Sequence, residues 1–160
     1  MELRVELLNT ENINKLVDFE VQSRVTEAEI FSNNFDKDSF KSKTLKALTN
    51  PSYKSCFCLL CFNEHENVVG RVDFCLLPSL AFGGDLRAYV DWVYVLKEER
   101  HKGIAQFLFN KMEEILRQKE AGEYILIVAE NKDAQRFYES LKGKQIKQEP
   151  VLTREMEMVL

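Results

Sequence analysis

Apolar positions repeat along this chain with two different periods, and these periods predict its secondary structure. Between residues 104 and 116, apolar side chains recur every three or four positions, which is typical of a helix with one buried face. Between residues 89 and 96, and again between 124 and 129, apolar residues run almost without interruption, which favours buried strands. The helical stripe consists of Ile104, Phe107, Leu108, Met112, Ile115 and Leu116. The pattern therefore predicts a strand, a helix and a second strand in succession.

The rest of the chain predicts further elements of both kinds. A first helix is expected to begin at Asn9 or Thr10, because both residue types are favoured helix caps. The pair Asn50-Pro51 ends a second helix, since the residue before a proline avoids the helical conformation. The expected spans are a strand within residues 1–7, helices ending near 23 and covering 37–48, strands over 55–62 and 67–77, a loop over 78–87 and a closing strand over 155–160.

Composition favours one globular domain over residues 1–160. The 160 residues are 45% hydrophobic and 30% charged, and no linker or internal repeat marks a second domain. The net charge of −4 argues against a nucleic acid or an anionic membrane as partner. The apolar runs are shorter than the roughly 20 residues of a membrane helix, and the first residues do not resemble a signal peptide. We therefore expect a cytoplasmic location.

Four cysteines raise the question of a metal site or a disulfide. Cys56 and Cys58 would lie on one face of a predicted strand and Cys61 on the other, while Cys75 belongs to the next strand. Such an arrangement cannot bring the thiolates together around one zinc ion without distortion. We therefore expect no metal and no disulfide, and interpret the cysteines as small buried apolar residues.

The short segment between the strand over 89–96 and the helix from 104 carries the most specific chemical signal. A turn of small residues leaves backbone N–H groups unpaired where a helix begins, and the helix dipole adds about half a positive charge there. Gly103 permits a close backbone approach, and the basic residues before it add side-chain donors. The predicted phosphate site consists of Arg100, His101, Lys102, Gly103, Ile104 and Ala105.

This segment resembles the Arg/Gln-x-x-Gly-x-Gly/Ala signature of the GCN5-related N-acetyltransferase (GNAT) superfamily. The preceding strand ends in Val-x-x-x-x-Arg, from Val95 to Arg100, and the stretch from Asn131 resembles the family's Asn-x-x-Ala-x-x-Phe-Tyr helix. Two departures are His101, where relatives often carry Gly, and Ala105, the less common of two permitted residues. The resemblance implies an α/β fold with a mixed sheet in the order β-α-α-β-β-β-α-β-α-β.

The resemblance also implies an activity, namely N-acetyl transfer from acetyl-CoA as co-substrate, with no metal. The acceptor would be a primary amine of a small molecule or of a protein, and a homodimer is possible. The alternative is a non-catalytic module that binds acyl-CoA on the same fold. Besides the predicted phosphate site, the implied acetyl-CoA contacts are Val93, Tyr94, Val95, Asn131 and Phe137. Asn131 also stands where a helix cap is expected.

Acetyl transfer to an amine needs a base and a proton for the departing thiolate. Asp91 is the candidate base, because it is the only charged residue of its strand and burial there should raise its pKa. The alternative is a structural carboxylate paired with Arg87 or Arg71. Tyr138 is the acid that the resemblance implies, and the alternative for it is a core aromatic residue on a helical stripe.

The acceptor-binding region that the resemblance implies covers about residues 24–40 and the loop over 78–87. Its acidic residues would favour a cationic acceptor, unless they form a solvated surface with helix caps. Its aromatic residues could equally line an apolar pocket. The acidic residues are Glu27, Glu29, Asp36 and Asp38, and the aromatic ones are Phe31, Phe35 and Phe82.

Overall fold

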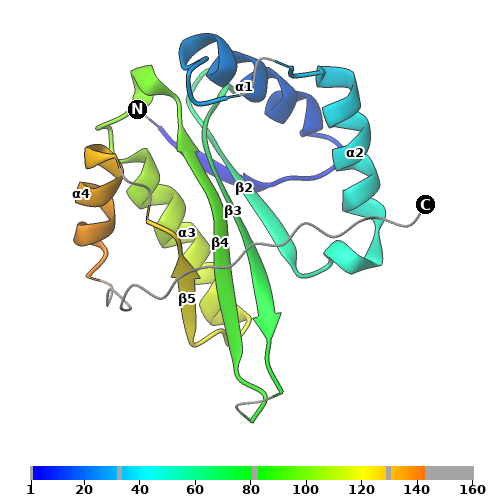
Figure 1. The fold of residues 1–160 in the computed structure, drawn as a ribbon, viewed down its shortest axis with the longest axis vertical. Helices are drawn as coiled ribbons and strands as arrows, with labels where there is room; N and C mark the ends of the chain where they lie inside the picture. Colours follow the sequence, from blue (N-terminus) through cyan, green and yellow to red (C-terminus); the bar gives the residue numbers. More distant parts are fainter. Residues whose placement is uncertain (1, 32–33, 81–82, 129–130, 143–160) are drawn as a thin grey trace. The chain divides into compact units, whose positions relative to one another are not determined.

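Five strands form one mixed sheet in the order β1-β2-β3-β4-β5 (Figure 1). The computed structural model describes residues 2–31, 34–80, 83–128 and 131–142. The chain divides into two compact units, residues 1–127 and residues 128–160. The described elements of the first unit are β1 (Arg4–Leu7), α1 (Ile13–Thr26), α2 (Lys37–Thr49), η1 (Pro51–Tyr53), β2 (Cys56–Phe62), β3 (Val68–Pro78), β4 (Leu86–Val95), η2 (Lys97–Glu99), α3 (Ile104–Gln118) and β5 (Glu123–Leu126). The second unit contains α4 (Lys132–Ser140).

The α/β class with a mixed sheet, predicted from the sequence, is confirmed. Neighbouring strands from β1 to β4 pair antiparallel, whereas β4 and β5 pair parallel. A parallel pair needs a long crossover connection, and α3 supplies it between β4 and β5. The closing strand predicted over residues 155–160 lies outside the described residues.

Three boundaries differ from the sequence prediction. α1 begins at Ile13 with Asn12 as its N-cap, later than expected, because Asn9 accepts hydrogen bonds from two backbone N–H groups in a turn before the helix. β4 begins at Leu86 and forms a long hairpin with β3, where a loop to residue 87 was expected. β5 ends at Leu126, and residues 127 and 128 are exposed, so the expected burial on both faces is wrong at that end.

The two faces of the sheet are covered by different helices. Gly70 of β3 lies against Ile104 of α3, while the next residue, Arg71, pairs with Glu20 of α1. Successive residues of a strand point to opposite faces, so α1 and α3 pack on opposite sides. The residues of α3 buried against the sheet are Ile104, Leu108, Phe109, Met112 and Leu116. Phe109 is thus a core residue that the predicted stripe omitted, and Phe107 is only partly buried.

Candidate functional site

β4 carries an extra residue at Asp91, and its pairing with β5 stops just before that residue. Across β3, Asp73 faces Trp92 whereas Phe74 faces Val90, so Asp91 is a bulge residue with no register partner. On the other side, the parallel pairing with β5 ends at Val90. Figure 1 shows β4 continuing past the end of β5. Within the described residues, this edge of β4 therefore has no neighbouring strand beyond Val90.

Backbone groups of Val93 and Val95 point to this open edge. The N–H of Leu96 donates to the carbonyl of Val69 at 3.0 Å, which shows that Leu96 faces β3. In an antiparallel pair, the residues that bond to one neighbour alternate with residues that point away from it. By this alternation Tyr94 also faces β3, and Val93 and Val95 face the opposite way. Val93 presents its N–H and C=O groups, and Val95 its N–H group, as an unpaired edge strand does, whereas the carbonyl of Val95 accepts a hydrogen bond from Arg100.

The turn after β4, residues 100–103, holds two residues in the left-handed backbone conformation. The φ angle is +62° at His101 and +81° at Gly103. This conformation costs a residue with a side chain roughly 1–2 kcal/mol, whereas glycine adopts it readily. A Cβ at position 103 would meet no atom within 4 Å. The space over Gly103 is therefore open to a ligand.

α3 begins directly after this turn, with backbone donors that no side chain caps. Gly103 is the N-cap residue, and the first helical bond runs from the N–H of Phe107 to the carbonyl of Gly103 at 3.0 Å. The N–H groups of Ile104, Ala105 and Gln106 precede that bond and have no partner within the helix. They form the positive end of the helix dipole. This geometry suits a diphosphate group, the ligand class that the sequence predicted.

The basic side chains of the turn have different environments. Arg100 points into the protein: its Nε donates to the carbonyl of Val95 at 3.1 Å, and its terminal nitrogens donate to both carboxylate oxygens of Glu27. Lys102 is exposed and pairs with Glu99 at 2.8 Å between Nζ and Oε2. His101 is exposed. The guanidinium of Arg100 thus connects the turn to β4 and to Glu27. The sequence alone did not indicate this role.

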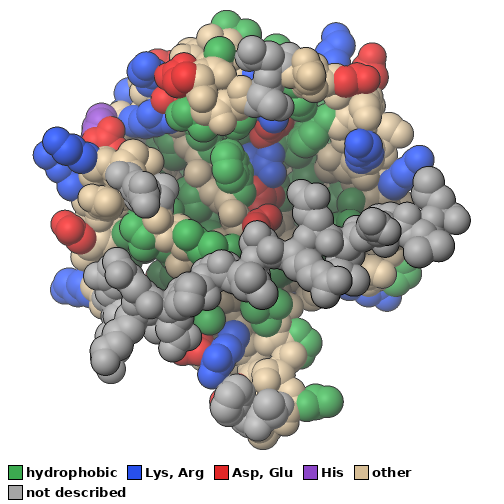
Figure 2. All heavy atoms as spheres, viewed as in Figure 1, with side chains coloured by type: hydrophobic (Ala, Val, Ile, Leu, Met, Phe, Trp, Pro, Cys, Tyr) green, Lys and Arg blue, Asp and Glu red, His purple; other side chains and the backbone are tan. Residues whose placement is uncertain are grey.

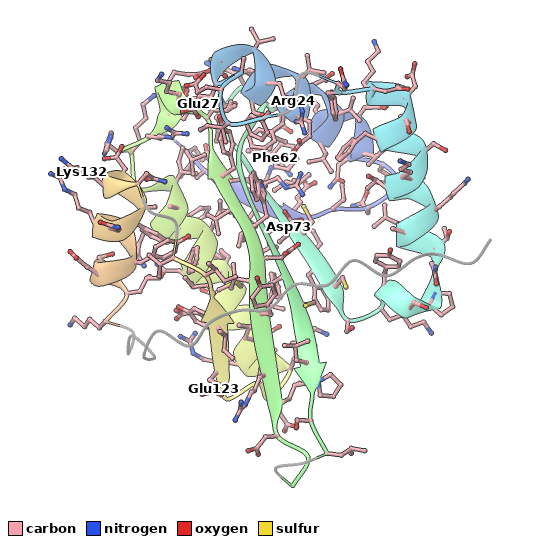
Figure 3. All side chains as sticks on the ribbon, viewed as in Figure 1. Arg24, Glu27, Phe62, Asp73, Glu123 and Lys132 are labelled. Carbon is pink, nitrogen blue, oxygen red and sulfur yellow. The ribbon has the colours of Figure 1, made fainter. Side chains whose placement is uncertain are left out.

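Glu27 is buried, so its assignment to an acidic surface was wrong. Only 4% of the residue is exposed, and its carboxylate accepts hydrogen bonds from Arg100 and, at 2.5 Å, from the hydroxyl of Tyr94. Burial by itself raises the pKa of Glu27, but the hydrogen bonds from Arg100 and Tyr94 and the charge of Arg100 bring the pKa below its ordinary value. Figure 3 shows Glu27 where the end of α1 meets β4. Glu27 is therefore an anion held inside the protein.

Asp91 is exposed, which corrects the expectation that its neighbours in the strand bury it. The bulge explains the difference, since the extra residue is left out of the ladder. Burial is the main cause that raises the pKa of the Cys75 thiol, and the charges of Cys56 and then of nearby Asp91 raise it further. The two arginines weighed as partners lie in other ion pairs, Arg87 with Glu123 and Arg71 with carboxylates of β3 and α1. Asp91 is thus accessible to solvent.

A partly buried ionic network on the α1 face was not predicted from the sequence. Arg71 donates to Asp73 at 2.7 Å and to Glu20, which also pairs with Arg24. Burial raises the pKa of Asp73, although the charge of Arg71 opposes this effect. Figure 2 shows charged side chains of both signs together at the centre of the view, where Figure 3 labels Asp73. Charged residues alternating with Val72 and Phe74 in a strand were the signal that could have indicated the network.

The other residues of the expected acceptor region divide into a helix cap, exposed acidic residues and two phenylalanines, Phe31 and Phe35, that line one pocket as the apolar-pocket alternative expected. Asp36 is the N-cap of α2 and accepts hydrogen bonds from the N–H groups of Asp38 and Ser39, which confirms the capping alternative for this residue. Phe31 packs against Trp92 and Tyr94, with ring centroids 6.1 and 5.3 Å apart. Phe35 packs against Phe40, and Glu29 and Asp38 are exposed. Phe82 lies outside the described residues.

The second unit contains Asn131, Phe137 and Tyr138. Asn131 is the N-cap of α4 and accepts a hydrogen bond from the N–H of Ala134 at 2.8 Å, as the sequence predicted. The rings of Phe137 and Tyr138 contact each other with centroids 5.4 Å apart. Burial raises the pKa of Tyr138. The phenol is therefore protonated at neutral pH, as a proton donor must be.

Neither a metal cluster nor a membrane span is found in the described part of the chain. No group of three or more potential metal ligands converges among those residues, and all four cysteines are free thiols. Cys56 is exposed, which corrects the expectation that the cysteines are buried, whereas Cys58 and Cys61 are buried as predicted. No helix in that part is long and apolar enough to cross a membrane.

Comparison with known protein families shows which class of protein has this fold and this turn. The model of the acetyltransferase (GNAT) family matches residues 22–143, well over half of the chain. The chain therefore belongs to the GNAT acetyltransferase family, and the resemblance inferred from its motifs is confirmed. A comparison with curated proteins gives no match.

Solved structures share the whole fold at low sequence identity. A ribosomal-protein-alanine N-acetyltransferase from Brucella melitensis biovar Abortus is 17% identical, with a TM-score of 0.73 over 97% of this chain and 100% of that one. An aminoglycoside acetyltransferase from an uncultured soil metagenomic sample, in complex with sisomicin, is 19% identical, with a TM-score of 0.73 over 97% of both chains. A transcriptional regulator from Bacillus halodurans is 19% identical, with a TM-score of 0.75 over 96% of this chain and 100% of that one. At these identities the likeness concerns the fold alone.

Proposed function

We propose that this protein transfers an acetyl group from acetyl-CoA directly to a primary amine of a small molecule or a protein. One observation carries the proposal: the outward backbone groups of β4 and the open turn before α3 follow each other within a few residues. The first can bind an extended amide-containing chain, and the second can bind a diphosphate. Acetyl-CoA combines these two chemical groups with a thioester.

Named groups of the chain would bind the donor. Val93 and Val95 would pair with the amides of the pantetheine arm as an added strand does. The N–H groups at the start of α3 would hold the diphosphate over Gly103, where the structure leaves open space. Asn131 and Phe137 are proposed as further contacts on the basis of the family motif.

The amine must lose a proton before it can attack. An alkyl ammonium with an ordinary pKa of about 10.4 is neutral in roughly one molecule in 2,500 at pH 7, a handicap of about 4.6 kcal/mol. We propose that Asp91, which is exposed beside the bulge, accepts this proton directly or through a water molecule. The amine nitrogen then bonds to the thioester carbon and gives up its second proton to water as the carbon–sulfur bond breaks. Tyr138 donates a proton to the departing sulfur and regains one from solvent.

We also propose where the protein is located and how its chain is organised into domains. Four free cysteines fit a reducing compartment, so we place the protein in the cytoplasm. We further propose that residues 1–160 act as one catalytic domain, because the family motifs extend from Arg100 to Tyr138 and the family model matches residues 22–143.

The test is release of thiol from acetyl-CoA in the presence of a panel of amines that includes polyamines, aminoglycosides and peptides with free N-termini. The wild type should release thiol with at least one amine, and Tyr138→Phe should reduce kcat about 10²- to 10⁴-fold, the usual range for a general acid. Tyr53→Phe, at an exposed tyrosine, is the matched control. Binding of acetyl-CoA without turnover across the panel would instead favour the non-catalytic module.

A further inference from the structure

We propose that Glu27 is a positioning residue for acetyl-CoA, because it holds the turn of residues 100–103 in its binding conformation through Arg100. The inference rests on the proposed function, since it concerns the same turn. It assigns a role in donor binding to a residue of α1's C-terminal end, which is remote in sequence from the motif.

The carboxylate of Glu27 is too buried to persist without partners. A buried charge is strongly destabilising unless hydrogen bonds compensate it. Here both oxygens are used: one accepts from Arg100 at 3.0 Å, and the other accepts from Arg100 and, at 2.5 Å, from Tyr94. The lowered pKa of Glu27 agrees with a carboxylate that stays ionised.

Arg100 joins three segments through one planar group. Its terminal nitrogens donate to the carboxylate of Glu27, at the end of α1. Its Nε donates to the carbonyl of Val95, the last residue of β4. It is also the first residue of the turn itself. The guanidinium therefore fixes the direction in which the chain leaves β4 and enters the left-handed residues His101 and Gly103.

The ion pair of Glu27 and Arg100 stabilises a turn that contains a strained residue. His101 adopts a left-handed conformation although it carries a side chain, and such residues persist only when their surroundings determine them. A turn fixed in advance binds a ligand more tightly than one that must be ordered on binding. Glu27 provides that order by holding Arg100 in place.

The sign of the effect separates positioning from simple electrostatics. If Glu27 acted only through its charge, its removal would make the surroundings of the turn more positive, and the anionic acetyl-CoA would bind more tightly. If Glu27 positions the turn, its removal weakens binding. Glu27→Gln has nearly the same shape and loses the charge, so it distinguishes the two mechanisms.

Calorimetric titration with acetyl-CoA provides the test. Glu27→Gln should raise the Kd about tenfold, within the range typical of coupled sites, and should raise the KM for acetyl-CoA more than it lowers kcat. Glu29→Gln makes the same charge change at an exposed position two residues away and should leave the Kd within about twofold of the wild type. A Glu27→Gln variant that binds as tightly as the wild type, or more tightly, would overturn the inference.

A double-mutant cycle with Arg100→Gln tests whether Glu27 acts through Arg100. The double variant should bind acetyl-CoA no more weakly than Arg100→Gln alone, whereas multiplied effects would show that the two residues act independently. If Glu27→Gln does not fold, Tyr94→Phe removes one hydrogen bond from the same carboxylate and should weaken binding in the same direction; unchanged binding would contradict positioning. Failure of the wild type to bind acetyl-CoA would refute the proposed function itself, so the two failures are distinguishable.

Discussion

A Cβ on Gly70 would lie 2.9 Å from Cγ2 of Ile104, the first residue of α3. The same atom would lie 3.2 Å from Leu108 and 3.3 Å from Val95. The missing side chain in β3 therefore lets the N-terminal turn of α3 pack directly on the sheet. The proposed diphosphate site is formed by that helical turn. Gly70 therefore determines how closely the site approaches β3 and β4.

Gly70→Val should therefore destabilise the protein and displace the start of α3. The branched side chain overfills a closed space, which usually costs about 1–3 kcal/mol. Urea denaturation measures this loss, and acetyl-CoA should bind more weakly to the folded fraction. Gly122→Ala, where a Cβ meets nothing within 4 Å, is the matched control and should change stability by less than about 0.5 kcal/mol. Equal stability of the two variants would contradict the packing described.

Gly103→Glu should keep the fold and lose most of its affinity for acetyl-CoA. The space around position 103 is open, so the cost to folding is the left-handed backbone, about 1–2 kcal/mol. The added carboxylate would occupy the proposed diphosphate position and repel it. Gly103→Ala bears the same backbone strain without charge, so calorimetry on both variants isolates the effect on binding. Similar affinities for the two would argue against a diphosphate at this turn.

Asp91→Asn should lower kcat about 10²- to 10⁴-fold, the usual contribution of a general base, and leave the KM for acetyl-CoA nearly unchanged. The substitution keeps the size of the side chain and removes its basicity. Steady-state kinetics between pH 6 and about 9 would show the loss, and the deficit should shrink as the pH rises, because a larger fraction of the amine is then neutral without a base. Asp18→Asn, at an exposed aspartate of α1 outside the expected acceptor region, is the control. Full activity of Asp91→Asn would exclude this residue as the base.

The ionised state of Glu27 should contribute stability that disappears in acid. The pKa of Glu27 in the folded protein is below its ordinary value of 4.5, because the hydrogen bonds from Arg100 and Tyr94 outweigh the effect of burial. Its contribution is therefore complete above the unfolded pKa and is lost as the pH falls through the folded pKa. Burial raises the pKa of Asp73, so Asp73 also titrates in acid. Because it is present in both the wild type and the variant, its contribution to stability cancels when the two are compared.

Denaturation of the wild type and Glu27→Gln at a series of pH values tests this linkage. The difference in unfolding free energy should be largest at neutral pH and should shrink progressively below about pH 4.5, the ordinary pKa of this carboxyl group. A difference that stays constant down to pH 3 would show that the charge of Glu27 has no role in stability.

Local patterns in the sequence predicted the features that depend on local chemistry. The stripe from Ile104 to Leu116 predicted α3, and Asn131 predicted the cap of α4. Gly103 adopts the left-handed conformation that only glycine enters freely, so its residue type indicated the turn. His101 shares that conformation, which gives a physical reason why relatives often carry glycine there.

Features that depend on register or on distant residues could not be predicted in the same way. A strand pattern indicates which residues alternate, but one extra residue at Asp91 changes which side chains are covered, and no local signal marked it. The pair of Glu27 and Arg100 joins positions separated by 73 residues. From the sequence, Glu27 was one acidic residue among several, and only the fold distinguishes it from Glu29.

A crystal structure of the complex with CoA would show whether the turn of residues 100–103 and the open edge of β4 bind the acetyl donor. We expect the diphosphate within hydrogen-bonding distance of the N–H groups at the start of α3, and the pantetheine arm paired with the backbone of Val93 and Val95. A complex in which CoA occupies another surface, with the turn over Gly103 facing only solvent, would contradict this expectation.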